Sequence, residues 1–73
     1  MNINELIGLK SQLDRADVLN SPDPYSWDLI ENAMFCLRNG MEYRAMMSLR
    51  TLAANYRNMG LYNAAAMVER VIG

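Results

Sequence analysis

The chain has 73 residues, of which 52% are apolar and 21% are charged, a composition typical of one folded domain rather than of a disordered chain. The formal net charge of −1 argues against general nucleic-acid binding. With no histidine and a single cysteine, the chain cannot form the usual Ser–His or Cys–His catalytic pairs, an internal disulfide or a Cys/His zinc site. We therefore expect no enzyme, no metal or cofactor and no small-molecule substrate.

The sequence also lacks membrane and secretion signals. No apolar run approaches the roughly 18 residues of a transmembrane helix, and the opening "MNINELIGLK" has no basic segment of the secretory type. The unpaired Cys36 fits a reducing compartment and, because it falls on the flank of an apolar helix face, is interpreted as a structural thiol. We expect a cytoplasmic protein that does not contact a membrane.

The apolar periodicity predicts a first helix over residues 3–16, and Asn2 and Glu5 have the spacing of a capping box at its start. Its predicted core stripe consists of Ile3, Leu6, Ile7, Leu9, Leu13 and Ala16. The following "DVLNSPDP" predicts a linker over residues 17–23, because it combines two prolines with Asn, Ser and Asp. Either Asp23 or Ser26 could cap the next helix.

Three further helices are predicted, over residues 24–38, 42–58 and 61–72, with Gly40 and Gly60 ending the second and the third. The short connections predict antiparallel neighbours. In the helix over 24–38, Phe35 falls on the polar side, away from a core face made of Trp27, Ile30, Ala33, Met34 and Leu37. The helix over 61–72 has few polar residues, so we expect other helices to cover it on more than one side.

The helix over 42–58 is apolar on two opposite sides. Its inner face is predicted to contain Ala45, Leu49, Leu52, Ala53 and Tyr56. The opposite side carries a second seam of Tyr43, Met47, Arg50, Ala54 and Arg57. Tyr, Met and Arg are enriched at the centres of protein interfaces. The seam is therefore either covered by another helix of the same chain or exposed as a docking surface.

The charges are distributed unevenly along the chain. Residues 1–37 hold two basic and six acidic side chains (−4), whereas residues 38–73 hold five arginines and two glutamates (+3). One interpretation is chance, or pairing between helices within the fold. The other is electrostatic attraction to an acidic partner, or head-to-tail association of two copies.

The stretch "LAANYRNMGLYNAA" at residues 52–65 resembles the middle of a tetratricopeptide repeat. The positions that carry the resemblance are Leu52, Ala53, Tyr56, Gly60, Tyr62 and Ala65. The sequence departs from the repeat pattern at two points. Gly40 and Gly60 lie 20 residues apart instead of about 34, so the helix over 42–58 must belong to both hairpins. Glu69 also stands where the repeat has a large apolar residue. The resemblance implies α-hairpins that bind protein. Small chains of this kind include type III secretion chaperones, and phage-encoded inhibitors are a further class of small helical chains.

These observations predict an all-α fold, a small four-helix domain of antiparallel α-hairpins that is tetratricopeptide-like. The predicted function is non-enzymatic binding of another protein, as an adaptor, a chaperone or an inhibitor. The predicted contact residues are Tyr43, Met47, Arg50, Ala54 and Arg57, with Phe35 as an outlier. One alternative is a structural homo-oligomer that joins two copies through the same seam. A second alternative is a nucleic-acid accessory protein that uses the arginine-rich C-terminal half.

Overall fold

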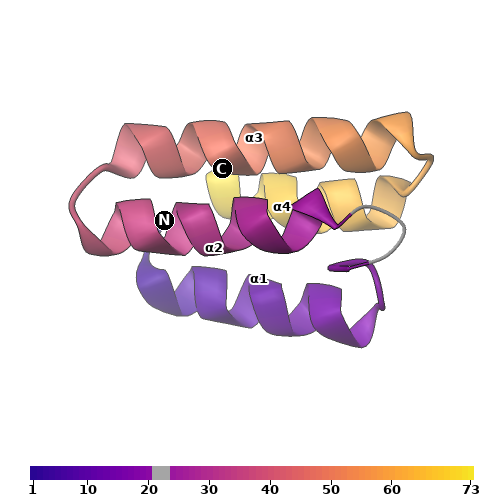
Figure 1. Ribbon diagram of the computed structural model, residues 1–73, viewed down its shortest axis with the longest axis horizontal. Helices are drawn as coiled ribbons and strands as arrows, with labels where there is room; N and C mark the ends of the chain where they lie inside the picture. The colour runs from indigo at the N-terminus through magenta and orange to yellow at the C-terminus, as the bar shows by residue number, and fades with distance from the viewer. Residues whose placement is uncertain (21–23) are drawn as a thin grey trace.

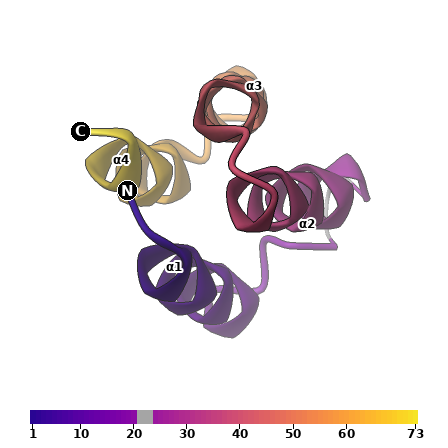
Figure 2. The same cartoon turned by 90° about the vertical axis from the view of Figure 1, so that its left-hand side faces the viewer.

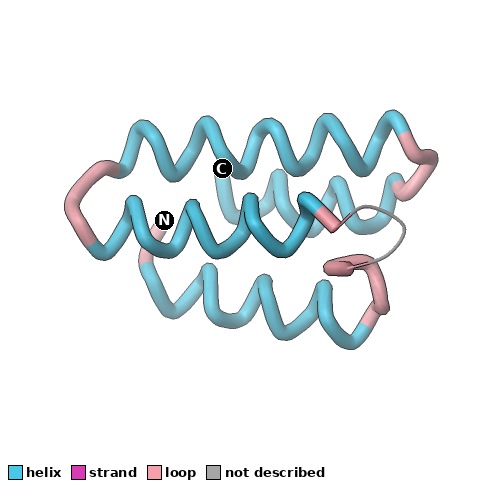
Figure 3. Tube along the Cα trace, viewed as in Figure 1, coloured by secondary structure: helices cyan, strands magenta, loops and turns pink. Residues whose placement is uncertain are grey.

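The computed structural model describes residues 1–20 and 24–73, and these form four α-helices and no strand. The helices are α1 (Ile3–Arg15), α2 (Tyr25–Arg38), α3 (Glu42–Asn58) and α4 (Tyr62–Ile72), as Figure 1 and Figure 3 show. The predicted all-α four-helix class is therefore confirmed. Each helix begins and ends at most one residue from its predicted boundary. Of the predicted linker, residues 21–23 lie outside the described residues.

The four helices are arranged around a common core. Helix α3 packs against α2 and α4, α1 packs against the same two helices, and α1 and α3 lie diagonally opposite across the core. Figure 2, viewed nearly along the helices, shows this arrangement. The pairs α2–α3 and α3–α4 are antiparallel hairpins that share α3. Helix α1 closes the side of the core that lies opposite α3.

The core consists of apolar side chains from all four helices and from the segment after α1. The buried set is Leu6, Leu9, Leu13, Val18, Leu19, Ile30, Ala33, Met34, Cys36, Ala45, Leu49, Leu52, Ala53, Tyr56, Ala64, Ala65 and Val68. Side-chain hydrogen bonds to backbone carbonyl oxygens help to attach α3 to its surroundings. The Tyr56 hydroxyl donates to the Val18 carbonyl oxygen over 3.1 Å, and the Ser48 hydroxyl donates to the Leu29 carbonyl oxygen over 2.8 Å.

Local sequence signals explain the start of α1 and the ends of α2 and α3. The Asn2 side chain accepts from the Glu5 amide and the Glu5 carboxylate accepts from the Asn2 amide, each over 2.9 Å, so the capping box is present. Gly40 and Gly60 have φ values of 74° and 77° and adopt the left-handed conformation expected after α2 and α3.

The start of α2 differs from the prediction. Pro24 occupies the cap position and no side chain caps the helix, so Ser26 is not the cap. The reason is that Ser26 lies inside the first turn of α2, where its side chain is fully buried. The alternative cap, Asp23, lies outside the described residues.

Helix α1 buries a narrower stripe than the sequence predicted. Ile7 is 48% exposed and Ala16 is exposed as the residue that follows the helix. Both residues were predicted to lie in the core. They are exposed because α1 has only α2 and α4 as neighbouring helices, and the side of α1 that faces them carries Leu6, Leu9 and Leu13. Helix α4 contacts α3 and α1, and is thus covered on two sides as expected.

The junction between α1 and α2 is partly polar. The Lys10 Nζ atom lies 4.0 Å from the centroid of the Trp27 ring and forms an ion pair with Glu31. Trp27 is half-buried at the margin of the core, and Lys10 forms a cation–π contact with its ring.

The capping box gives a testable contribution to stability. Replacing Asn2 by alanine should lower the free energy of unfolding by about 1 kcal/mol, because the Glu5 amide loses its acceptor. For a domain of this size the melting temperature should fall by roughly 4–8 °C. Thermal unfolding followed by circular dichroism measures the change. The control Asn4→Ala, an exposed position in the same turn, should show a clearly smaller shift; equal shifts would contradict the cap assignment.

Candidate protein-docking surface

The outer side of α3 is uncovered. Figure 2 shows α2 and α4 below α3 and no helix on its other side. The five predicted seam residues are all exposed, with Tyr43 at 69% and Met47 at 42%. We call this set (Tyr43, Met47, Arg50, Ala54 and Arg57) the outer seam. Within residues 1–20 and 24–73, no helix covers the outer seam, which excludes the first of its two interpretations.

The outer seam forms a continuous line along the helix. Its residues follow one another at intervals of four, three, four and three. Because α3 is helical from Glu42 to Asn58, this spacing places them in one row that spans about 21 Å. Alternating steps of three and four are the spacing with which one helix packs along another in a coiled coil.

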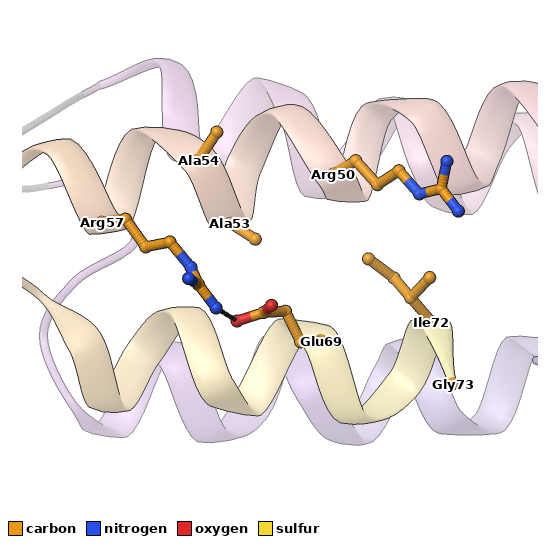
Figure 4. Close-up of a pocket in the computed structure, with 7 residues that line it drawn as sticks. All are labelled: Arg50, Ala53, Ala54, Arg57, Glu69, Ile72 and Gly73. Carbon is orange, nitrogen blue, oxygen red and sulfur yellow. Dashed lines mark hydrogen bonds and ion pairs between the residues drawn. The ribbon is translucent and has the colours of Figure 1, made fainter.

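A groove borders the seam where α3 meets α4. It has a volume of about 330 Å³ and is lined by Arg50, Ala53, Ala54, Arg57, Glu69, Ile72 and Gly73. In Figure 4, Arg57 reaches across the groove to Glu69, while Arg50 extends along α3 and does not cross to α4. The small Ala53 and Ala54 side chains leave the space between these groups open.

A second groove borders the seam where α3 meets α2. It is lined by Leu29, Asn32, Cys36, Arg44, Met47, Ser48 and Thr51. The outer seam therefore contributes Met47 to one groove and Arg50, Ala54 and Arg57 to the other. Side chains of a partner could enter grooves on both sides of α3.

The arginines along α3 differ in their pairing. The Arg57 guanidinium donates to the Glu69 carboxylate, and this hydrogen bond, followed by the Coulomb attraction, raises the pKa of Arg57 above its usual value. Arg50 and Arg44 are exposed and have no acidic partner among residues 1–20 and 24–73. Two unpaired positive charges therefore border the apolar part of the seam.

The charge segregation of the chain is not explained by pairing between its two halves. Among the described residues, Lys10 pairs with Glu31 inside the acidic half, and Arg57 pairs with Glu69 inside the basic half. No ion pair in this part of the chain joins a C-terminal arginine to an N-terminal carboxylate. Both ion pairs join neighbouring helices, as the interpretation of pairing within the fold predicts, but neither joins the acidic half of the chain to the basic half.

Phe35 is exposed as predicted, at 60%, but lies apart from the seam. It belongs to the last turn of α2 and does not line the groove between α2 and α3. Arg44 was missed, although its place on the helical wheel beside Met47 could have indicated it. The exposed aromatic residues Tyr25 and Tyr62, in the first turns of α2 and α4, were also missed.

The described residues offer no metal centre, since no three His, Cys, Asp or Glu side chains among them lie close enough to bind one. Among the carboxylates of the first half of the chain, Asp14, Asp17 and Asp28 are exposed, and Glu31 pairs with Lys10. Cys36 is buried and free. None of the helices described is long and apolar enough to cross a bilayer.

No family model matches the chain, and comparisons with curated proteins and with solved structures also gave no match. What is established is the four-helix all-α fold.

Proposed function

We propose that this protein acts, without catalysis, by binding another protein along the outer seam of α3. The observation that carries the proposal is the exposure of Tyr43, Met47 and Arg50 in one row on the helix that contributes most to the core. Tyr and Arg are enriched among the residues that contribute most to binding energy, and Met is enriched in the composition of protein interfaces. Met47 is suited to an irregular partner surface, because its unbranched side chain adapts to the groove that it borders.

The shared position of α3 supports this proposal. Helices α2 and α4 pack against the inner side of α3, so the outer seam lies on a packed helix rather than on a loop. A rigid, pre-formed surface loses little conformational entropy on binding. The small size of the domain suits an adaptor, a chaperone or an inhibitor, which needs a surface and no reaction chamber.

The tetratricopeptide-like character belongs to the same proposal. The α2–α3 and α3–α4 hairpins share α3, as the 20-residue separation of Gly40 and Gly60 requires. We propose that these hairpins serve protein binding in the manner of small helical chaperones, including those of type III secretion. A cytoplasmic location is also proposed, and the free Cys36 is consistent with it.

The variant Met47→Asp tests the proposal. Because Met47 is 42% exposed, the substitution should change the free energy of unfolding by less than about 1 kcal/mol. It should nevertheless remove the complex, because a partner would bury the introduced carboxylate without a counter-charge. Thermal unfolding measures the first effect. Native mass spectrometry of the protein isolated gently from the cells that produce it measures the second.

The matched control is Ser11→Asp, which places the same charge on the exposed side of α1. It should retain both the stability and the complex. A complex that survives Met47→Asp, or a complex that Ser11→Asp removes equally, would refute binding through the outer seam.

A further inference from the structure

We infer that the outer seam binds an acidic amphipathic helix of a different protein, and that Arg50 prevents the seam from pairing with a second copy of this chain. The inference rests on the proposed function and specifies the partner. It follows from two features: the spacing of the seam residues and the position of the unpaired Arg50 among them.

The spacing favours a helix as the partner. The four-three repeat keeps the seam in line with a second helix that crosses α3 at about 20°, so that side chains of one helix fit between those of the other. The row of five positions covers most of α3, from Tyr43 to Arg57. The grooves on both sides of α3 leave space for the flanking side chains of such a helix.

The charges favour an acidic partner. Arg50 is the central residue of the seam and has no carboxylate partner in residues 1–20 and 24–73. A docked helix would remove water from it, and a guanidinium that loses water without a counter-ion is strongly destabilising. A carboxylate on the partner, opposite Arg50, would form a charge-assisted and bidentate hydrogen bond. Arg44, on the α2 side of the seam, would attract a second one.

Arg57 does not require a carboxylate from the partner. Its guanidinium is already paired with Glu69 across the groove. The partner therefore needs apolar side chains facing Met47 and Ala54 and a carboxylate facing Arg50. This pattern describes an amphipathic helix with an acidic residue inside its apolar face.

The same residue disfavours self-association. If two copies paired α3 in antiparallel fashion, the two kinds of seam position would face one another, so Arg50 of each copy would be buried against Met47 or Ala54 of the other without a counter-ion. Parallel pairing in register would place Arg50 against Arg50. Like charges at the centre of a helix pair select against it, a common means of partner specificity.

The variant Arg50→Leu tests whether Arg50 prevents two copies of the chain from pairing. Sedimentation equilibrium from micromolar to millimolar concentration should show a monomeric wild-type protein and a dimeric variant. Adding Met47→Asp to Arg50→Leu should dissociate the dimer again. The control Arg70→Leu, an exposed arginine of α4, should remain monomeric. A dimeric wild-type protein, or a monomeric Arg50→Leu variant, would overturn the inference that Arg50 blocks self-pairing.

A designed peptide tests whether the outer seam binds an acidic amphipathic helix. The probe is a fluorescently labelled helical peptide of three heptads, with Leu facing Met47 and Ala54 and Glu facing Arg50. Its counterpart carries Lys in place of Glu. Fluorescence anisotropy should show at least tenfold tighter binding of the Glu peptide, and Arg50→Glu should reverse the preference. Equal binding of both peptides would overturn the inference of an acidic helical partner. So would a protein that binds a DNA duplex through Arg50 but does not bind the Glu peptide.

The two proposals can fail separately. If Met47→Asp removes the natural complex and Arg50→Glu leaves it intact, the outer seam is the docking surface but its partner is not an acidic helix. If neither variant affects the complex, the proposed function falls with the inference.

Discussion

Replacing Tyr56 by alanine should leave most of the protein unfolded at room temperature. Tyr56 is the largest fully buried side chain, and truncation of a large buried aromatic residue typically costs about 3–5 kcal/mol. A single core in a domain below roughly 80 residues seldom supplies more than about 3–5 kcal/mol in total. The loss is therefore comparable with the whole stability of the domain. Far-ultraviolet circular dichroism would show the loss of helix directly.

The variant Tyr56→Phe separates the ring from the hydroxyl. It keeps the ring in the core but leaves the Val18 carbonyl oxygen without the donor that lies 3.1 Å away. A buried acceptor without its partner costs about 1–3 kcal/mol, so this variant should fold and melt early. Urea unfolding of the three proteins should give the order wild type, Tyr56→Phe, Tyr56→Ala. A Tyr56→Ala protein as stable as wild type would contradict the central position of this side chain.

The second large effect concerns α1. Leu13→Ala should lower the free energy of unfolding by about 2–5 kcal/mol, because the leucine is fully buried between α1 and the rest of the core. Ile7→Ala on the same helix should cost less than about 1 kcal/mol, since this side chain is 48% exposed. Urea unfolding measures both. The reverse order would mean that α1 presents its other side to α2 and α4.

The helix boundaries could be predicted because they depend on local chemistry. Asn2 with Glu5, and the glycines at positions 40 and 60, define ends by interactions within a few residues of the chain. The cap of α2 could not be predicted in the same way. Whether Ser26 caps the helix or lies inside it depends on how deeply the first turn packs into the core.

The candidate site could be predicted only in part. The sequence identified the row from Tyr43 to Arg57, because helical periodicity alone places these residues together. It could not say whether a helix covers the row, because that depends on the packing of α1. The same limit explains the wrong prediction for Ile7. A hydrophobic side chain indicates burial, but the sequence does not show which helix would cover it. The Arg57–Glu69 pair joins two helices and becomes apparent only in three dimensions.

The diagonal arrangement of α1 and α3 has a consequence for how the domain opens. Helix α1 is attached only to α2 and α4, whereas α3 holds those two helices together from the other side. The chain can therefore release α1 as a unit while the two hairpins around α3 stay associated. We expect such a partial opening to require less free energy than complete unfolding, so that the amides of α1 exchange with solvent faster than those of α3. A helix docked along α3 would strengthen the inner unit and leave the release of α1 unhindered.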